Sequence, residues 1–73
     1  GLVRAFTLAG ARAVLASLWP VEDGATALLL ADVHAALRGG ATPAQALQRA
    51  QRAAALAGEH PFHWAAFTLH GQG

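Results

Sequence analysis

The chain has 73 residues, of which 55% are hydrophobic and only 12% are charged, and its formal net charge is +1. This composition excludes an intrinsically disordered chain, and the scattered arginines form no basic stripe that would favour nucleic acid as a partner. Because the sequence contains no cysteine, neither a disulfide nor a thiolate-rich metal cage can stabilise so short a chain.

The same composition indicates that part of the apolar surface belongs against other protein. A chain of this length buries only about 60% of the surface that its unfolded state exposes. The absence of methionine from the whole sequence favours the interpretation of residues 1–73 as the C-terminal segment of one larger domain. Lys, Asn, Ile and Tyr are also missing. Since these residues have AT-rich codons, we predict a GC-rich, bacterial genome.

The longest apolar run gives no sign of a membrane span. Asp32 and His34 interrupt it, and it is far shorter than the roughly 20 residues that cross a bilayer. No signal-peptide pattern precedes it. The sequence therefore predicts a cytoplasmic chain with no membrane partner.

The first part of the chain predicts a helix followed by a strand. Residues 2–9 have apolar spacing compatible with a helix, and Gly10 suits the left-handed position at which helices end. Residues 12–19 form a nearly continuous apolar run, which favours a strand buried on both faces. Pro20 ends this strand because proline cannot donate to a sheet.

Two helices are predicted next. Apolar residues recur at helical spacing over residues 25–38, and the two glycines that follow supply the stop. Thr42 suits the N-cap of a second helix, Pro43 its first position, and Gln45 the capping box. This second helix is expected to run to about Ala57.

After a turn around Pro61, residues 64–69 predict a second strand, so the order is helix, strand, helix, helix, strand. Two strands cannot form a stable sheet with helices on both faces. The buried strand at 12–19 needs neighbours on either side, of which this chain offers at most one. We therefore predict an α/β fold whose sheet is incomplete without upstream strands from the same domain.

Four groups of residues, taken in chain order, match the pattern of a known protein family. They are residues 1–6 with 8–14, residues 16–23, residues 42–47 with 49–51, and residues 60–67. In this order and spacing they resemble the C-terminal half of the CHAT domain family, and the resemblance covers essentially the whole chain.

CHAT domains belong to the caspase, separase and gingipain type of cysteine peptidase. The resemblance implies a caspase-like three-layer sandwich with a mostly parallel sheet, and a catalytic histidine and cysteine upstream of this segment. None of His34, His60, His63 and His70 aligns with the family's catalytic histidine, and there is no cysteine to align. No catalytic residue and no cofactor is therefore predicted for this chain.

The resemblance implies a substrate-side role instead. Ligands of open α/β sheets collect beyond the carboxyl ends of the strands, where Ser17, Leu18 and Trp19 are expected. The loop that follows adds Glu22 and Asp23. Trp19 would then form an apolar wall, and Glu22 or Asp23 would pair with an arginine or lysine of the substrate.

Each of these residues also has a purely structural interpretation. Glu22 and Asp23 favour a helix start as much as a substrate contact, because acids suit the N-cap and the first turn. Trp19 fits the core more often than a cleft. Ser17 lacks the neighbouring base that a nucleophile needs.

Two further pairs of residues, one of histidines and one of arginines, each have more than one possible role. His60 and His63 have a spacing that can hold a metal, but no third ligand is visible, so we predict no metal and assign them to anchoring the final strand. Arg49 and Arg52 predict a solvated helix face, with a helical-repeat domain as an alternative partner.

The resemblance implies a C-terminal, substrate-recognition segment of a CHAT-type cysteine endopeptidase, which is expected to be inert alone because the family's catalytic dyad is upstream. Its partners would be the upstream half of the domain and a protein or peptide substrate. The alternative is a segment of a catalytically degenerate CHAT domain that acts as a protein-interaction scaffold and docks helical repeats.

Overall fold

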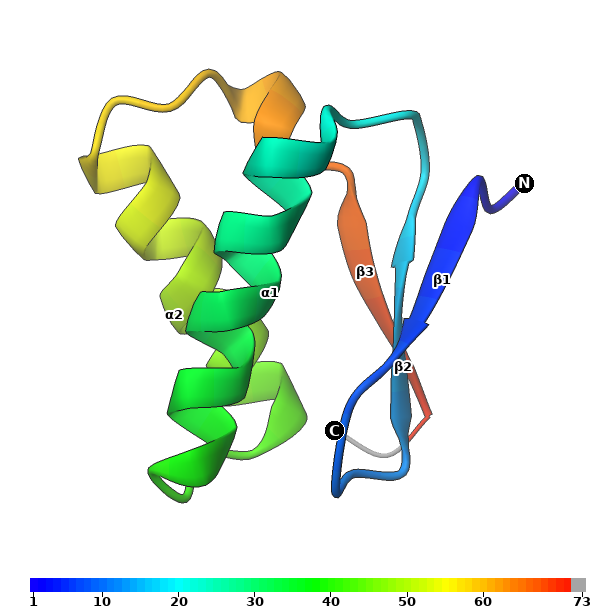
Figure 1. Ribbon diagram of the computed structural model, residues 1–73, viewed down its shortest axis with the longest axis vertical. Coiled ribbons are helices and arrows are strands. Elements are labelled where there is room, and N and C mark those ends of the chain that lie inside the picture. The colour runs from blue at the N-terminus through cyan, green and yellow to red at the C-terminus, as the bar shows by residue number, and fades with distance from the viewer. Residues whose placement is uncertain (72–73) are drawn as a thin grey trace.

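The protein is described by a computed structural model that covers residues 1–71 and consists of two layers. A three-stranded sheet forms one layer, and both helices lie on one side of it (Figure 1). The elements in chain order are β1 (Arg4–Thr7), β2 (Ala13–Ser17), α1 (Asp23–Arg38), α2 (Pro43–Leu56), the 3-10 helix η1 (Pro61–His63) and β3 (Phe67–Gly71).

The first element is a strand, so the helix predicted for residues 2–9 is wrong. β1 pairs antiparallel with β2, and Phe6 lies opposite Leu15. Phe6 and Leu8 fit a two-residue period as well as a helical one, and periodicity cannot decide so short a segment. Gly10 does have the expected positive φ of 76°, but this conformation serves the turn between two strands and not the end of a helix.

β2 is the central strand of the sheet. It pairs antiparallel with β1 on one side and with β3 on the other, where Leu15 lies opposite Leu69. The chain therefore supplies both neighbours of β2, and the expectation of at most one was wrong. The α/β class is confirmed, but these three strands are antiparallel and the order of elements is strand, strand, helix, helix, strand.

The starts of the two helices follow the capping chemistry of the sequence. α2 has the predicted capping box, in which Thr42 Oγ1 accepts from the backbone N–H of Gln45 at 3.2 Å. In return, Gln45 Oε1 accepts from the backbone N–H of Thr42 at 3.0 Å. α1 begins at Asp23, two residues before the predicted start, because Glu22 acts as its N-cap.

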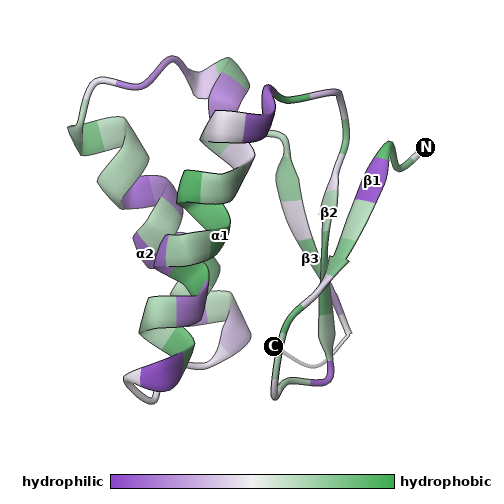
Figure 2. Cartoon of the chain, viewed as in Figure 1, coloured by the Kyte–Doolittle hydropathy of each residue, from purple (hydrophilic) through white to green (hydrophobic). Residues whose placement is uncertain are grey.

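The core lies between the sheet and the helices. Leu15 from β2 and Val33 from α1 are fully buried and meet in one cluster with residues of α2. Hydrophobic residues run along both helices and the central strand (Figure 2). Each such side chain stabilises the fold by roughly 1.5–3 kcal/mol when fully buried. No helix among residues 1–71 is long and apolar enough to cross a membrane.

Gln51 joins α2 to the segment that leads into β3. Its Nε2 donates to the backbone carbonyl oxygens of Trp64 at 2.9 Å and Phe67 at 3.2 Å. The side chain of Gln51 is half-buried. This amide therefore fixes where β3 begins, three residues later than the strand predicted at 64–69.

Candidate functional site

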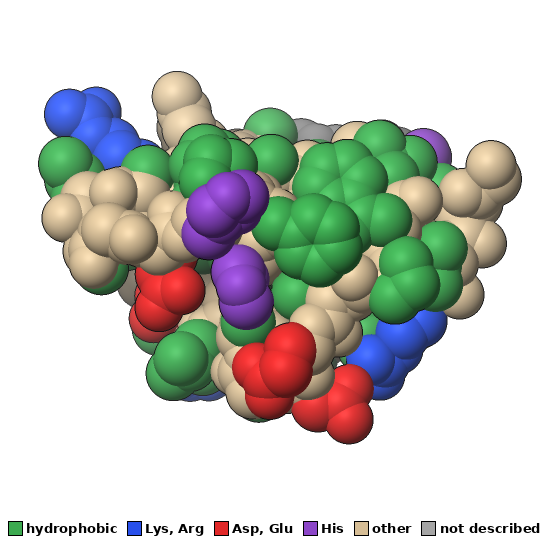
Figure 3. Space-filling model, turned by 90° about the horizontal axis from the view of Figure 1, so that it is seen from above, with side chains coloured by type: hydrophobic (Ala, Val, Ile, Leu, Met, Phe, Trp, Pro, Cys, Tyr) green, Lys and Arg blue, Asp and Glu red, His purple; other side chains and the backbone are tan. Residues whose placement is uncertain are grey.

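The loop of residues 18–22, called the β2–α1 loop below, connects the central strand to the first helix and lies against η1. The rings of Trp19 and Phe62 have centroids 5.6 Å apart and are tilted by 35°. Trp19 is half-buried, so it belongs partly to the core and partly to the surface. Seen from above, this end of the molecule carries acidic and histidine side chains beside a group of hydrophobic ones (Figure 3).

Glu22 is the N-cap of α1. Its Oε1 accepts from the backbone N–H of Gly24 at 2.7 Å, and its Oε2 accepts from that of Ala25 at 3.0 Å. A Cβ on residue 24 would lie 2.8 Å from Glu22 Oε1, so the glycine makes room for the side chain to fold back. Of the two interpretations of Glu22, the structure shows helix capping.

Asp23 presents its carboxylate to solvent and holds a guanidinium group. Its Oδ1 accepts from Nη1 of Arg4 at 3.0 Å, with 92% of the Asp23 side chain and 47% of the Arg4 side chain exposed. The same guanidinium lies 4.9 Å from the centre of the Phe6 ring, within the distance of a cation–π contact. Sequence reasoning missed Arg4, because only a strand at residues 4–7 places it opposite Ser17, at the end of β2 that leads to Asp23.

The two residues that precede Trp19 have opposite environments. Ser17 is only 2% exposed, and its hydroxyl has no hydrogen-bond partner within residues 1–71. No base lies within hydrogen-bond distance of it there, as a nucleophilic serine would need. Leu18 is 46% exposed and offers apolar surface. Of these two residues, Leu18 is the one that faces outward.

His60 and His63 lie at η1 and have different environments. His60 Nδ1 accepts from the backbone N–H of Phe62 at 3.1 Å and thereby caps η1. Nδ1 of His63 is buried without a hydrogen bond in the described part of the chain. No group of three or more His, Cys, Asp or Glu side chains within residues 1–71 is arranged to hold a metal ion.

A groove between the two helices opens beside this end of the molecule and is called the α1–α2 groove. It encloses about 300 Å³. Its lining residues are Ala25, Leu28, Leu29, Asp32, Ala50, Ala53, Ala54, Ala57, Glu59, His63 and Trp64. Sequence analysis did not identify it as a site, because alanines at helical spacing predict only an inward-facing surface.

The fold and the loop define an α/β unit that has no cysteine nucleophile of its own. The family model of the CHAT domain matches residues 1–72. Tetratricopeptide repeat protein 28 of Homo sapiens is 39% identical to the chain over 72 residues, and the protein of the same name from Mus musculus is 38% identical. The chain belongs to the CHAT domain family, as the sequence resemblance predicted.

The match covers 96% of this chain but only 3% of each of these two relatives. The chain thus corresponds to a small part of much longer proteins. Both relatives are mammalian, so a bacterial origin stays a prediction from codon composition. No solved structure matches the chain.

Proposed function

We propose that this chain is the C-terminal, substrate-recognition side of a CHAT-type cysteine endopeptidase, with the catalytic histidine and cysteine in the upstream half of the same domain. The family supports this assignment, and the sequence contains no cysteine that could act as the nucleophile. The segment would contribute specificity, while the peptide-bond chemistry takes place on residues outside it.

The observation that carries the proposal is the pairing of Asp23 with Arg4 at the end of the central strand. An exposed carboxylate that already holds a guanidinium at 3.0 Å has the chemistry to bind an arginine or lysine of a substrate. Exposed ion pairs contribute only about 0–1 kcal/mol, so a substrate guanidinium can replace Arg4 at little cost. We therefore assign Asp23 as the residue that selects a basic side chain before the cleaved bond.

The other predicted site residues, at the end of β2 and in the β2–α1 loop, have supporting roles in this proposal. Leu18 and the half-buried Trp19 supply apolar surface for the stem of the substrate side chain. Ser17 is buried at the end of β2 and offers no surface to the substrate. Glu22 caps α1 and so fixes the first turn of this helix, which contains Asp23.

The proposal is tested on the intact protein that carries this segment together with the histidine and cysteine. Peptides that differ only in the residue before the cleaved bond (Arg, Lys, Leu or Glu) are compared. Asp23→Asn should lower kcat/KM for the arginine peptide by up to about five-fold, because an exposed ion pair contributes about 0–1 kcal/mol. Cleavage of the leucine peptide should not change.

Asp32→Asn is the matched control, since Asp32 is an exposed carboxylate on α1 outside the loop. An intact protein that cleaves all four peptides equally, or that is indifferent to Asp23→Asn, contradicts the basic specificity. A protein that cleaves none of them, with both catalytic residues present upstream, supports the alternative of a degenerate interaction scaffold.

Helical-repeat domains are a second proposed partner, supported by the name of the two relatives, tetratricopeptide repeat protein 28. Arg49 and Arg52 are exposed on α2, and within residues 1–71 neither forms an ion pair. In the intact protein, cross-links from cysteines introduced at these two positions should reach the repeats. Cross-links that form only elsewhere contradict a contact through this face.

A further inference from the structure

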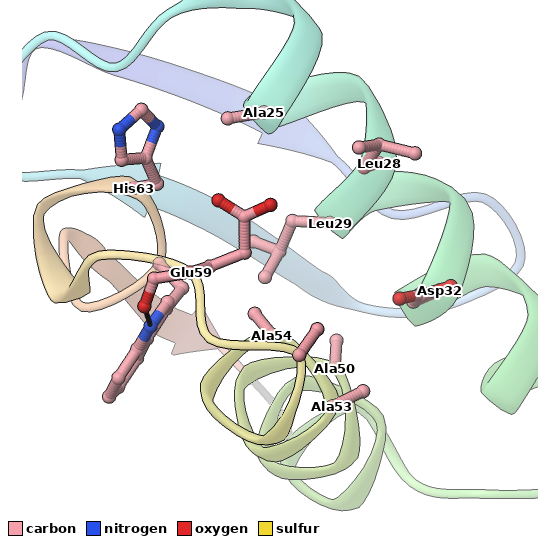
Figure 4. A pocket seen from close by; sticks show the side chains of 11 residues that line it. Ala25, Leu28, Leu29, Asp32, Ala50, Ala53, Ala54, Glu59 and His63 are labelled. Atoms are coloured by element: carbon pink, nitrogen blue, oxygen red, sulfur yellow. Dashed lines mark hydrogen bonds between the residues drawn. The ribbon is translucent and has the colours of Figure 1, made fainter.

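The α1–α2 groove is an apolar surface that the substrate proposal does not use. α1 contributes larger side chains to one wall, among them Leu28, which is 67% exposed. The opposite wall on α2 consists of alanines, and Figure 4 shows Ala50, Ala53 and Ala54 facing the cavity. Small side chains on one wall and an exposed leucine on the other leave room for bulky apolar groups, and about 300 Å³ reaches the lower end of the range for ligand pockets.

The charged residues of the groove are nearly all acidic. Asp32 lies toward one end, while Glu59 and His63 lie toward the other (Figure 4). These two carboxylates are half of the four acidic residues of the chain, and no arginine lines the groove. Within residues 1–71 neither carboxylate forms an ion pair. A complementary partner therefore carries positive charge at both ends of an apolar stretch.

The lining also restricts the backbone of the partner. Every lining residue belongs to α1, to α2 or to the segment around η1, and no sheet edge borders the groove. An extended peptide would find no strand with which to pair its backbone groups. A helix satisfies these groups internally and offers a stripe of side chains to a groove, so a helical partner fits better.

We propose that the α1–α2 groove binds an amphipathic helix with leucine-sized residues along one face and arginine or lysine at both ends of that face. A second copy of the chain is a poorer occupant. A two-fold contact of groove against groove would bring two copies of Asp32 and two of Glu59 together, and like charges in an interface are unfavourable.

The probe for this proposal is a synthetic 18-residue helical peptide with leucines at positions i, i+4, i+7 and i+11 and two arginines at each end. It is titrated into the 73-residue chain while the backbone amide resonances and the tryptophan fluorescence are recorded, and of the two tryptophans Trp64 lines the groove. Saturable binding is expected at peptide concentrations below about 1 mM, which corresponds to about 4 kcal/mol of binding free energy. A matched peptide with glutamates in place of the arginines should bind at least about ten-fold more weakly, because like charges oppose association.

Variants of the chain test separately how the acidic side chains and the shape of the groove contribute to peptide binding. Asp32→Asn with Glu59→Gln should weaken binding about three- to ten-fold at low salt, as expected for exposed charge pairs. This difference should disappear in 1 M salt, where the Debye length is about 3 Å. Ala53→Phe should fill the groove and abolish binding, whereas Ala55→Phe, also exposed on α2 but outside the lining, should leave binding unchanged.

A second pair of variants keeps the proposal testable if Ala53→Phe does not fold. Leu28→Asn should weaken binding, and Leu56→Asn, an exposed leucine outside the lining, should not. Absence of binding at 1 mM peptide, equal binding of the arginine and glutamate peptides, or equal effects of the paired variants would each overturn the proposal. Self-association of the chain that Ala53→Phe abolishes would identify a second copy as the occupant and would also overturn it.

Discussion

The indole N–H of Trp19 donates a hydrogen bond of 2.9 Å to the backbone carbonyl oxygen of Phe62, which lies 43 residues later in the chain. Together with the contact between the two rings, this bond fixes the β2–α1 loop to η1. The β2–α1 loop, which leads to Asp23, is therefore positioned by a segment three residues before β3. A change at either residue should affect both the stability of the fold and the geometry of the loop.

We expect Trp19→Phe to cost about 0.5–1.5 kcal/mol of unfolding free energy, because the variant keeps an aromatic ring against Phe62 but loses the N–H donor. Trp19→Ala should cost more, yet less than the roughly 3–5 kcal/mol for a fully buried ring, since Trp19 is only half-buried. Urea unfolding followed by circular dichroism measures both. Equal losses for the two variants would contradict a contribution from the ring.

Gln51→Leu should destabilise the chain by about 1–3 kcal/mol, because it removes both hydrogen bonds from the side-chain amide and leaves part-buried carbonyl oxygens without a donor. Gln48→Leu is the matched control on the exposed face of α2 and should change the free energy of unfolding by less than about 0.5 kcal/mol. Comparable losses at the two positions would show that the bonds of Gln51 contribute nothing specific.

Most of the correct sequence predictions were based on helix-capping residues and on long apolar patterns. The start of α2 at Pro43 follows from the reciprocal bonds between Thr42 and Gln45, which depend only on residues three apart. The central position of Leu15 follows from a continuous apolar run. Local chemistry of this kind is visible in the sequence, because the residues that determine it are neighbours in the chain.

The first strand and the pairing of Arg4 with Asp23 could not be predicted in the same way. β1 has only four residues, and its identity as a strand depends on pairing with β2. The misassigned helix then concealed the position of Arg4 opposite Ser17. The α1–α2 groove was missed for a related reason: it depends on how two helices pack, and alanine spacing on one helix does not reveal the shape of the space between them.

Gly71→Ala should be among the most destabilising substitutions of a small residue. Gly71 has a φ of 103°, and an added Cβ would lie 2.5 Å from the backbone oxygen of Arg12. Gly40 is the matched control, because its φ of 98° is similar but no atom lies within 4 Å of the added Cβ. Gly40→Ala should cost about 1–2 kcal/mol for the backbone conformation alone. Gly71→Ala should cost distinctly more in thermal unfolding, and equal losses would contradict a close approach of the two strands.

Arg4→Gln tests the finding that Asp23 is occupied by an internal guanidinium. In the 73-residue chain, the loss of this exposed pair should lower the free energy of unfolding by less than about 1 kcal/mol, and the loss should shrink as salt is added. In the intact protein, the same change frees the carboxylate that we propose for the substrate. The KM for peptides with arginine before the cleaved bond should therefore fall, while kcat/KM for the leucine peptide stays the same.

Arg12→Gln is the control for Arg4→Gln, since it removes an exposed arginine from the turn between β1 and β2, and Arg12 forms no ion pair within residues 1–71. The control keeps the net charge of the two variants equal, so a difference between them reports on Asp23 and not on the overall charge. If Arg4→Gln and Arg12→Gln change the KM for the arginine peptide to the same extent, the effect is general electrostatic attraction. If Arg4→Gln raises this KM, Arg4 itself contacts the substrate, and the assignment of Asp23 as the selecting residue is wrong.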